Sequence, residues 1–446
     1  MKKFVNDPKQ FVPDMLKGLA RANPGTIKYV PEYNLIMRAD APNDNKVSIV
    51  QGSGSGHEPA HVMAVGRGML DAACPGDVFS APPVDYITET TKLLRSAKGV
   101  LYLVNNYTGD RLAFEMAAEL SDAEGIHVET LIIDDDVSVS NSTYTVGRRG
   151  VAGNFFVIKA VGAASEKGAD IDQLLNIGKK VNGVTRSMGI ALSSCTPPAK
   201  GVPLFAIAED EMEVGIGIHG EPGRRRTKLG SADEIVTLLL DAIVTDLPYK
   251  EGDRVALMAN GLGGTPISEL YLLYGLAHAQ LEKRGIRIGR SYVGEYCTSL
   301  EMAGASLTLV RLDDEIEALL ALRKGAAHHD ILDILRLHAG LGNQAAHHLG
   351  RHVIRPHARQ RALAGQGERR ACIACDHDVR HGELPNEWVR LRGPAAYGFR
   401  SGAFHRGRTI LQGILRLPLN VLELDDRSFQ RATLLVQHVE ALLHGG

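Results

Sequence analysis

Several residue types and patterns are scarce in this chain, and each shortage excludes a class of protein. Its 446 residues include 1 Trp and only 5% aromatic residues, which argues against the aromatic platforms that stack single-stranded nucleic acid. The 50 Lys and Arg against 52 Asp and Glu give a net charge of -2, so no strong field favours nucleic acid. No apolar run approaches the roughly 18–20 residues that cross a bilayer, so we expect no membrane partner.

Targeting and redox signals are equally scarce. The first residues, MKKFVNDPKQFVPDM, contain no apolar stretch, so we expect no signal peptide. The 5 cysteines are scattered and odd in number, as is typical of reduced thiols. We therefore expect a cytoplasmic protein. The phosphate-binding pattern G-x-x-x-x-G-K-[ST] does not occur anywhere in the chain.

The composition changes near residue 322. Residues 323–446 hold 17 Arg, 1 Lys and 12 of the 17 His, whereas residues 1–322 hold 16 Arg and 16 Lys. The same tail lacks sustained helical or alternating periodicity. Such a basic tail could bind RNA or an acidic partner. We favour a poorly ordered extension translated out of the ancestral frame, because GC-rich coding shifted by one base tends to yield Arg, Ala, Gly and His.

Before residue 322, strand-like and helix-like patterns alternate. Aliphatic or β-branched runs that end in Gly, Asn or Asp predict strands at 46–52, 99–106, 127–136, 213–220, 254–261 and 305–313. Helices are predicted at 62–70, 110–125, 231–244 and 265–285, the last two capped by Ser231 and Thr265. This alternation predicts an α/β fold with sheets flanked by helices, in two α/β domains at 1–185 and 186–322, followed by the atypical Arg/His-rich extension 323–446. Ligands of such sheets bind at the carboxyl ends of strands.

One of these strand ends is a glycine-rich loop, IVQGSGSGHEPAH, at residues 49–61. Its glycines allow backbone amides to approach a small polar ligand closely. His57 lies at the end of the loop beside Glu58, where its pKa could suit general acid–base chemistry. A purely structural histidine is the alternative.

Two further strand ends carry candidate side chains. Asp110, in LVNNYTGDRLAFE, follows a glycine turn, where it could cap the helix or accept the proton of a substrate hydroxyl. His219, in EVGIGIHGEPG, ends an alternating strand and is sterically open because glycines surround it. Its imidazole nitrogen could add to an unhindered ketone or aldehyde and form a hemiaminal. Alcohols cannot react in this way, so such a site would select carbonyl compounds over polyols.

Six segments occur in an order that resembles the dihydroxyacetone kinase family, specifically its substrate-binding K subunit: GSGSGHEPAH, NNYTGDRLAFEMA, DDDVSVSNSTYTVGRRGVAG, ALSSCTPPAKG, EMEVGIGIHGEPG and NGLGGTPISELYLLYG. The resemblance extends over residues 1–322. It implies that His219 binds the carbonyl carbon of dihydroxyacetone covalently as a hemiaminal. It also implies that His57 assists proton transfer and that Asp110 activates the terminal hydroxyl. The substrate would contact the loop residues Gly54, Ser55 and Gly56.

One position departs from the family pattern. The family commonly has Lys-Asn-Tyr-Thr-Gly-Asp, and this chain has Asn105 in place of the lysine. We keep Asn105 among the predicted substrate-binding residues. Because a cation beside the substrate or the incoming phosphate is lost, a related ketose such as erythrulose competes with dihydroxyacetone as the expected substrate.

The resemblance also implies partners. Similar enzymes are fused to, or bind, a nucleotide-binding L subunit with a Gly-Asp-Gly-Asp-His-Gly-like stretch, and residues 323–446 contain nothing of that kind. We therefore expect no cofactor in this chain, Mg-bound ATP or ADP on a separate L subunit, and a homodimer of this chain. A non-catalytic ketose-binding regulator is the alternative, but retention of Asp110 together with His57 favours the kinase subunit.

Other signals are open to more than one interpretation. We expect Asp134, Asp135 and Asp136 to be structural, although they resemble a metal cluster. The stretch NGLGGT (260–265) could cradle an anion or form a turn or dimer contact. The basic clusters in GRRGVAG and at 224–226 fit a solvated face or a docking surface. In the tail, the residue types of a zinc site occur too closely spaced for us to predict a metal: Cys372, Cys375, His377 and His381.

Overall fold

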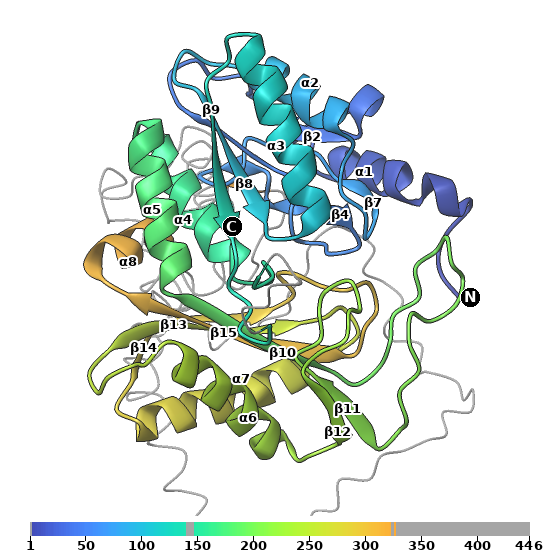
Figure 1. Cartoon of the computed structure of the whole chain (residues 1–446), viewed down its shortest axis with the longest axis vertical. Coiled ribbons are helices and arrows are strands. Elements are labelled where there is room, and N and C mark those ends of the chain that lie inside the picture. The colour runs from blue at the N-terminus through green and yellow to red at the C-terminus, as the bar shows by residue number, and fades with distance from the viewer. Residues whose placement is uncertain (1, 140–146, 323–324, 327–446) are drawn as a thin grey trace, which may run out of the picture. The chain divides into compact units, whose positions relative to one another are not determined.

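The computed structural model describes residues 2–139, 147–322 and 325–326. Two six-stranded sheets flanked by helices confirm the predicted α/β class (Figure 1). The predictions for the tail, including its zinc-like residue types, lie outside the described residues apart from 325–326. Among the helices of the described ranges, none has the length and apolar character needed to span a bilayer.

The first sheet has the strand order β1-β2-β6-β3-β8-β9. Its strands, in chain order, are β1 (Ile27–Val30), β2 (Leu35–Arg38), β3 (Ser48–Gln51), β6 (Ala72–Ala73), β8 (Val100–Asn105) and β9 (Val128–Ile133). The neighbours β6, β3, β8 and β9 are parallel, whereas β1 and β2 pair antiparallel. Every residue of β3 and β8 is buried, as their unbroken apolar runs predict for central parallel strands. The carboxyl ends of β3 and β8 therefore bring the glycine loop and the segment before Asp110 to one edge of the sheet.

The second sheet has the order β12-β11-β10-β15-β13-β14 and is mostly antiparallel. Its strands are β10 (Thr185–Ala191), β11 (Glu211–Val214), β12 (Arg225–Lys228), β13 (Arg254–Gly261), β14 (Arg287–Gly294) and β15 (Gly304–Leu312). Two short ladders complete the pairing: β4 (Gly54–Ser55) with β7 (Gly76–Val78), and β5 (Gly66–Arg67) with β16 (Gly325–Ala326). In the second ladder, β16, which follows the second sheet in the chain, pairs with β5, which lies between β3 and β6 of the first sheet in chain order.

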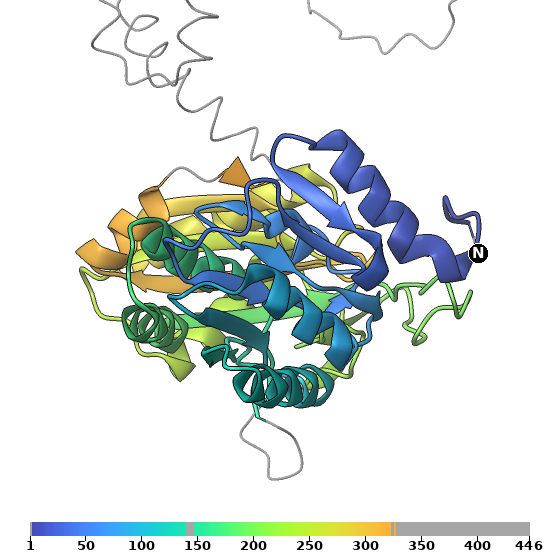
Figure 2. The same cartoon turned by 90° about the horizontal axis from the view of Figure 1, so that it is seen from above.

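The helices form layers around the two sheets (Figure 1). They are α1 (Phe11–Ala22), α2 (Val84–Leu94), α3 (Thr108–Ala123), α4 (Asn154–Glu166), α5 (Ile171–Gly183), α6 (Ala232–Asp246), α7 (Ile267–Lys283) and α8 (Asp314–Ala321), with 3-10 turns at η1 (Pro8–Gln10), η2 (Pro31–Tyr33) and η3 (Val62–Ala64). Helices α2 and α3 cover one face of the first sheet, and α6 and α7 cover the outer face of the second. Seen from above, α1 lies along the margin of the first sheet beside β1 (Figure 2).

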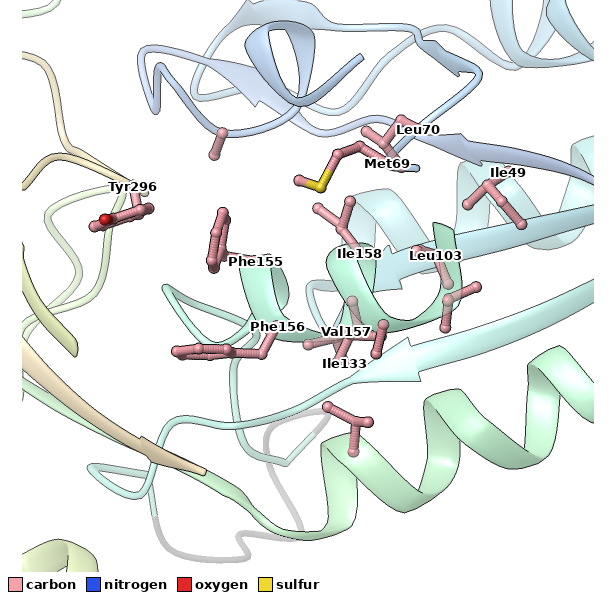
Figure 3. Packing of buried hydrophobic residues seen from close by; sticks show 14 of the residues in the cluster. Ile49, Met69, Leu70, Leu103, Ile133, Phe155, Phe156, Val157, Ile158 and Tyr296 are labelled. Carbon is pink, nitrogen blue, oxygen red and sulfur yellow. The ribbon is translucent and has the colours of Figure 1, made fainter. Parts of the chain in front are cut away.

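Helix α4 lies between the two sheets and joins their cores. Nearly all its residues are buried, as expected for a helix that is apolar on all sides. Figure 3 shows its Val157 and Ile158 among side chains of the first sheet and Phe155 pointing towards Tyr296. The Phe155 and Tyr296 ring centroids are 4.8 Å apart, and those of Phe156 and Tyr292 are 5.1 Å apart. This shared aromatic contact anchors the two sheets to one another beneath the site.

Glycine explains where the predicted elements are wrong. The strand predicted at 213–220 ends at Val214, because Gly215 and Gly220 have φ of 82° and 77° and break the extended backbone. The helix predicted at 62–70 is only η3, since Gly66 and Gly68 have φ of 157° and 73°.

The two predicted helix caps have different outcomes. Ser231 caps α6 in a capping box with Glu234, as predicted. Thr265 does not cap α7, because its hydroxyl bonds to Gly304 and Pro266 stands at the N-cap. The division into domains at residue 185 stays a prediction; α5 ends at Gly183 and β10 begins at Thr185.

Candidate active site

The glycine loop after β3 is fixed to the loop between β14 and β15. The amide of Leu300 donates to Gly56 O at 2.8 Å, and the amide of Thr298 donates to His57 O at 3.1 Å. The Thr298 hydroxyl donates to Glu58 O at 2.8 Å. The candidate site therefore forms where chain from the first sheet meets chain from the second.

His57 is a buried, neutral imidazole. Its side chain is 0% exposed, and Nδ1 lies 2.8 Å from the carbonyl oxygen of Thr298. A carbonyl only accepts, so Nδ1 carries the proton and Nε2 has a lone pair, for which the described residues provide no partner. Burial, followed by the nearby charges of His219 and His61, holds the pKa of His57 well below its usual value. His57 is thus neutral, with the Nε2 lone pair directed away from Thr298.

His219 lies edge-on to three aromatic rings. Its ring centroid is 4.7 Å from that of His57, 5.5 Å from Phe79 and 4.5 Å from Tyr107. The side chain is 18% exposed, so it is reachable by a small ligand. Nδ1 of His219 lies 3.2 Å from Oε1 of Glu221. The other ring nitrogen, Nε2, is the one left for chemistry.

Asp110 lies against the same glycine loop as His57. Its Oδ2 accepts a 2.7 Å hydrogen bond from the Ser53 hydroxyl, and the residue is 3% exposed. Burial raises the pKa of Asp110 to about 6, although the Ser53 hydrogen bond and the charge of His219 act in the opposite direction. The interpretation of Asp110 as a helix cap is wrong, because α3 begins at Thr108 after an N-cap at Tyr107. A buried carboxylate with a pKa close to neutrality suits proton transfer.

Backbone strain is concentrated around His57. In the described ranges, the non-glycine residues with positive φ are Asn34, His61, Phe79 and Leu300. Phe79 stacks on His57 with centroids 5.1 Å apart, and Leu300 bonds to the loop residue before His57. Gly56 has φ of 96°, and a Cβ there would approach the Phe79 ring to 2.8 Å. Strained residues that the surrounding structure holds in place often lie at functional sites.

The predicted loop residues and Asn105 lie close to this centre. Gly54 and Ser55 form β4, and the Ser55 hydroxyl donates to Gly76 O at 2.8 Å. Asn105 ends β8 and is 0% exposed. Neither its amide oxygen nor its amide nitrogen has a hydrogen-bond partner among the described residues. An unpaired buried amide is costly, which is consistent with a ligand as its missing partner.

Several residues of the site were not predicted from the sequence. Ser53 and Tyr107 lay in segments already singled out, but no spacing rule distinguished them from their neighbours. Glu221 lies two residues after His219, in the Gly-Glu-Pro-Gly turn, and was visible only as part of that turn. Phe79 and Thr298 come from segments without any motif, and only the tertiary structure brings them to His57.

The competing acidic and glycine signals prove to be structural. Asp135 accepts hydrogen bonds from the amides of Val151 and Gly153, at 2.9 and 2.8 Å. Within the described ranges, no group of three or more His, Cys, Asp or Glu side chains is placed to hold a metal ion. In the NGLGGT turn, the Glu295 carboxylate accepts the Gly263 amide at 3.1 Å, so a carboxylate already occupies the place of an anion.

The two basic clusters differ in exposure, since Arg148 and Arg149 are partly or fully buried and 224–226 are exposed. Arg149 is buried and donates to Asp136 at 2.7 Å. Arg148 pairs with Asp246, and Arg224 donates to the backbone oxygens of Val137 and Ser138. Arg224, Arg225 and Arg226 are all exposed, so this cluster still fits a solvated face or a docking surface.

Comparison with known proteins identifies the family. The model of the Dak1 domain matches residues 17–328. The chain belongs to the Dak1 domain family. A Dak1 relative from Escherichia coli (strain K12), the dihydroxyacetone-binding subunit DhaK of a PEP-dependent dihydroxyacetone kinase, is 43% identical over 344 residues, covering 72% of this chain and 96% of that protein.

Two further proteins similar to this chain have different functions in their names. The D-erythrulose kinase of Mycolicibacterium smegmatis is 37% identical, over 74% of this chain and 58% of its own length. The solved structure of the dihydroxyacetone kinase operon co-activator Dha-DhaQ is 34% identical with a TM-score of 0.67, over 71% of this chain and 98% of that chain. The Dak1 fold is thus shared by kinase subunits, a whole kinase and a co-activator.

Proposed function

We propose that this chain is the substrate-binding subunit of a ketose kinase and anchors a short ketose covalently on His219. The observation that carries this proposal is the 4.7 Å approach of the His219 and His57 rings, beside a loop that also holds Asp110 through Ser53. A nucleophilic imidazole, a neutral base and a buried carboxylate then converge on one small site.

The covalent step balances as follows. The Nε2 lone pair of His219 forms a bond to the carbonyl carbon, and the π pair of the carbonyl moves to oxygen, which takes a proton from solvent. The imidazole becomes an imidazolium, whose charge the Glu221 carboxylate balances. The terminal hydroxyl of the anchored ketose then gives its proton to Asp110, assisted by His57, as its oxygen attacks the terminal phosphorus of the nucleotide. The bond from that phosphorus to its bridging oxygen breaks, and the shortened nucleotide leaves with the electron pair.

The substrate is a short ketose, for which we propose dihydroxyacetone, with erythrulose as the competitor. The name of the Escherichia coli relative gives dihydroxyacetone as its ligand, and the name of the mycobacterial relative gives erythrulose as its substrate. The unpaired amide of Asn105 could bond either sugar, since both carry hydroxyl groups beside the carbonyl.

The phosphoryl group comes, in this proposal, from a Mg-bound nucleotide on a separate L-type subunit, either ATP or ADP that a phosphotransferase-system protein recharges. The resemblance that implies such a subunit also implies a homodimer of this chain. A purified chain that phosphorylated dihydroxyacetone from ATP without any partner would contradict the proposed division of labour.

An intact-mass measurement tests the anchoring directly. In native mass spectrometry at neutral pH, dihydroxyacetone or erythrulose is expected to add the mass of one ketose to the wild-type chain. Glycerol is the matched control, because it has similar hydroxyl groups and no carbonyl. His219→Ala should take up no ketose. An adduct of the same yield on His219→Ala would overturn the proposal.

A ketose-binding regulator is the second candidate, and the co-activator relative favours it. A sensor needs only the anchoring histidine, whereas a kinase subunit also needs Asp110 and His57. The two are separated by adding an L-type partner and Mg-nucleotide to the ketose-loaded chain. Ketose phosphate formation supports the kinase subunit, and binding without turnover supports the regulator.

A further inference from the structure

The structure assigns a role to Glu221 and Arg149 that goes beyond the three residues of the proposed mechanism. We propose that Glu221, which lies close to the charge of Arg149, is a positioning residue that keeps the proton of His219 on Nδ1 and so leaves Nε2 as the nucleophile. This inference rests on the proposed anchoring of a ketose on His219 and deepens it.

Glu221 contacts His219 at two points. Its Oε2 accepts the backbone amide of His219 at 2.9 Å, and its Oε1 lies 3.2 Å from Nδ1 of the same residue. The first contact fixes the carboxylate relative to the backbone, and the second orients the ring. A carboxylate can only accept, so the nitrogen that faces it must carry the proton. The lone pair is thereby assigned to Nε2, on the far side of the ring.

Arg149 keeps this carboxylate ionised within a largely buried environment. Burial opposes ionisation of Glu221, but the hydrogen bond and charge of His219 and the charge of Arg149 together lower the pKa of Glu221 to about 2. Arg149 is itself held by Asp136 and by the carbonyl oxygen of Gly215, each at 2.7 Å. A guanidinium remains charged at any pH that the protein meets, so the carboxylate has a permanent counter-charge.

Gly217 shows that the two groups meet. A Cβ at Gly217 would collide with both Oε2 of Glu221 and Nη1 of Arg149. Both polar atoms therefore lie against the same Cα, in the turn that leads to His219. Glycine is required here by the close approach of these side chains, since Gly217 does not have a positive φ. Gly217 therefore leaves room for the Glu221 and Arg149 side chains, which could not be predicted from the sequence of the turn.

The chemical consequence is specific. In Glu221→Gln, the oxygen of the amide would still accept the His219 backbone amide, so its NH2 group would face Nδ1. An NH2 group donates, so the ring would favour the tautomer with the proton on Nε2. That tautomer has no lone pair on the atom that attacks the ketose. Loss of a hydrogen-bonded partner that orients a reactive histidine typically costs roughly 10- to 100-fold.

The test measures two properties of the full chain, the association constant for the dihydroxyacetone adduct and the protonated nitrogen of His219 by ¹⁵N NMR of labelled histidine. Subtraction of the His219→Ala spectrum assigns the signal. We expect Glu221→Gln to lower the adduct constant roughly 10- to 100-fold and to move the proton from Nδ1 to Nε2. The surface pair of His278 and Glu282, with Nδ1 and Oε2 3.3 Å apart, gives a matched control. Glu282→Gln should leave the adduct constant unchanged.

The outcomes separate this inference from the proposed function. A wild-type adduct that Glu221→Gln forms equally well overturns the role of Glu221 and leaves anchoring on His219 intact. A wild-type chain that forms no adduct overturns the anchoring, and the NMR signal then decides the tautomer by itself. If Glu221→Gln does not fold, the wild-type spectrum still decides, because a proton on Nε2 of His219 contradicts the assignment.

Discussion

The hydroxyl of Ser53 donates to Oδ2 of Asp110 at 2.7 Å and thereby links the glycine loop to the start of α3. Ser53 stabilises the ionised form of a carboxylate that burial would otherwise keep protonated. The pair therefore sets the pH above which Asp110 can accept a proton.

Ser53→Ala should shift the pH dependence of catalysis. Asp110 must be ionised to act as a base, so activity is expected to fall as the pH drops through its pKa of about 6. Removing the hydroxyl raises that pKa further, by about one pH unit for the loss of one hydrogen bond to a charged group. The measurement is kcat/KM against pH with an L-type partner. Ser55→Ala, whose hydroxyl bonds to Gly76 instead, should leave the acid limb in place.

His57→Gln should separate anchoring from turnover. In the proposed mechanism His219 forms the covalent bond and His57 acts on protons, so the variant is expected to retain the ketose adduct. Phosphorylation should fall by roughly 10²- to 10⁴-fold, the usual contribution of a general base. Intact mass and a coupled kinase assay report the two properties on the same sample. Equal loss of adduct and turnover would show that His57 is needed for binding.

Asn105→Leu should weaken ketose binding without weakening the fold. Its amide atoms have no hydrogen-bond partner among the described residues, so a leucine of similar size removes an unpaired buried polar group. We expect unchanged or higher stability in urea and about tenfold weaker binding of the preferred ketose, for the loss of one hydrogen bond. Unchanged affinity for both dihydroxyacetone and erythrulose would remove Asn105 from the site.

Asp71→Asn should destabilise the fold strongly. The Asp71 carboxylate is 3% exposed and lies 2.8 Å from Lys46 Nζ, 2.9 Å from Arg38 Nη1 and 2.8 Å from the Ile49 amide. Its loss removes the buried counter-charge of Lys46 and Arg38, which then keep the more exposed Glu166 and, for Arg38, Asp40. Breaking such a buried pair costs about 3–5 kcal/mol in the free energy of unfolding. Asp210→Asn breaks an exposed pair with Lys228 and should cost less than about 1 kcal/mol. Equal effects in urea denaturation would contradict this difference.

The sequence predicted the sheets better than it predicted the site. Unbroken apolar runs identified β3, β8, β13 and β15, because central strands are buried on both faces. The edge strand β9 was also predicted, although it is only half-buried. His57, Asp110 and His219 were found because each follows a strand-like run or a glycine turn. The strand expected to carry His219 was wrong, since periodicity does not report the positive φ of Gly215.

The partners of these residues could not be predicted in the same way. Thr298 is 241 residues from His57, and no local pattern relates a carbonyl oxygen to a distant imidazole. The same holds for Phe79, which is placed by its positive φ and by packing against Gly56. Charge patterns were also ambiguous, because a buried arginine such as Arg149 has the same sequence signature as a solvated one.

The contact of Thr298 with His57 places the site between chain from the two sheets, so a bound ligand should affect the stability of both sheets. His219 follows β11 of the second sheet, and Asp110 lies in α3 after β8 of the first sheet. A sugar bonded to His219 and hydrogen-bonded to Asp110 would therefore connect the two sheets. A bound sugar would then hold the two sides together, since separating them requires breaking its hydrogen bonds on the Asp110 side while it stays bonded to His219. Slower amide exchange would be expected in both sheets at once, rather than only in the loops that touch the sugar.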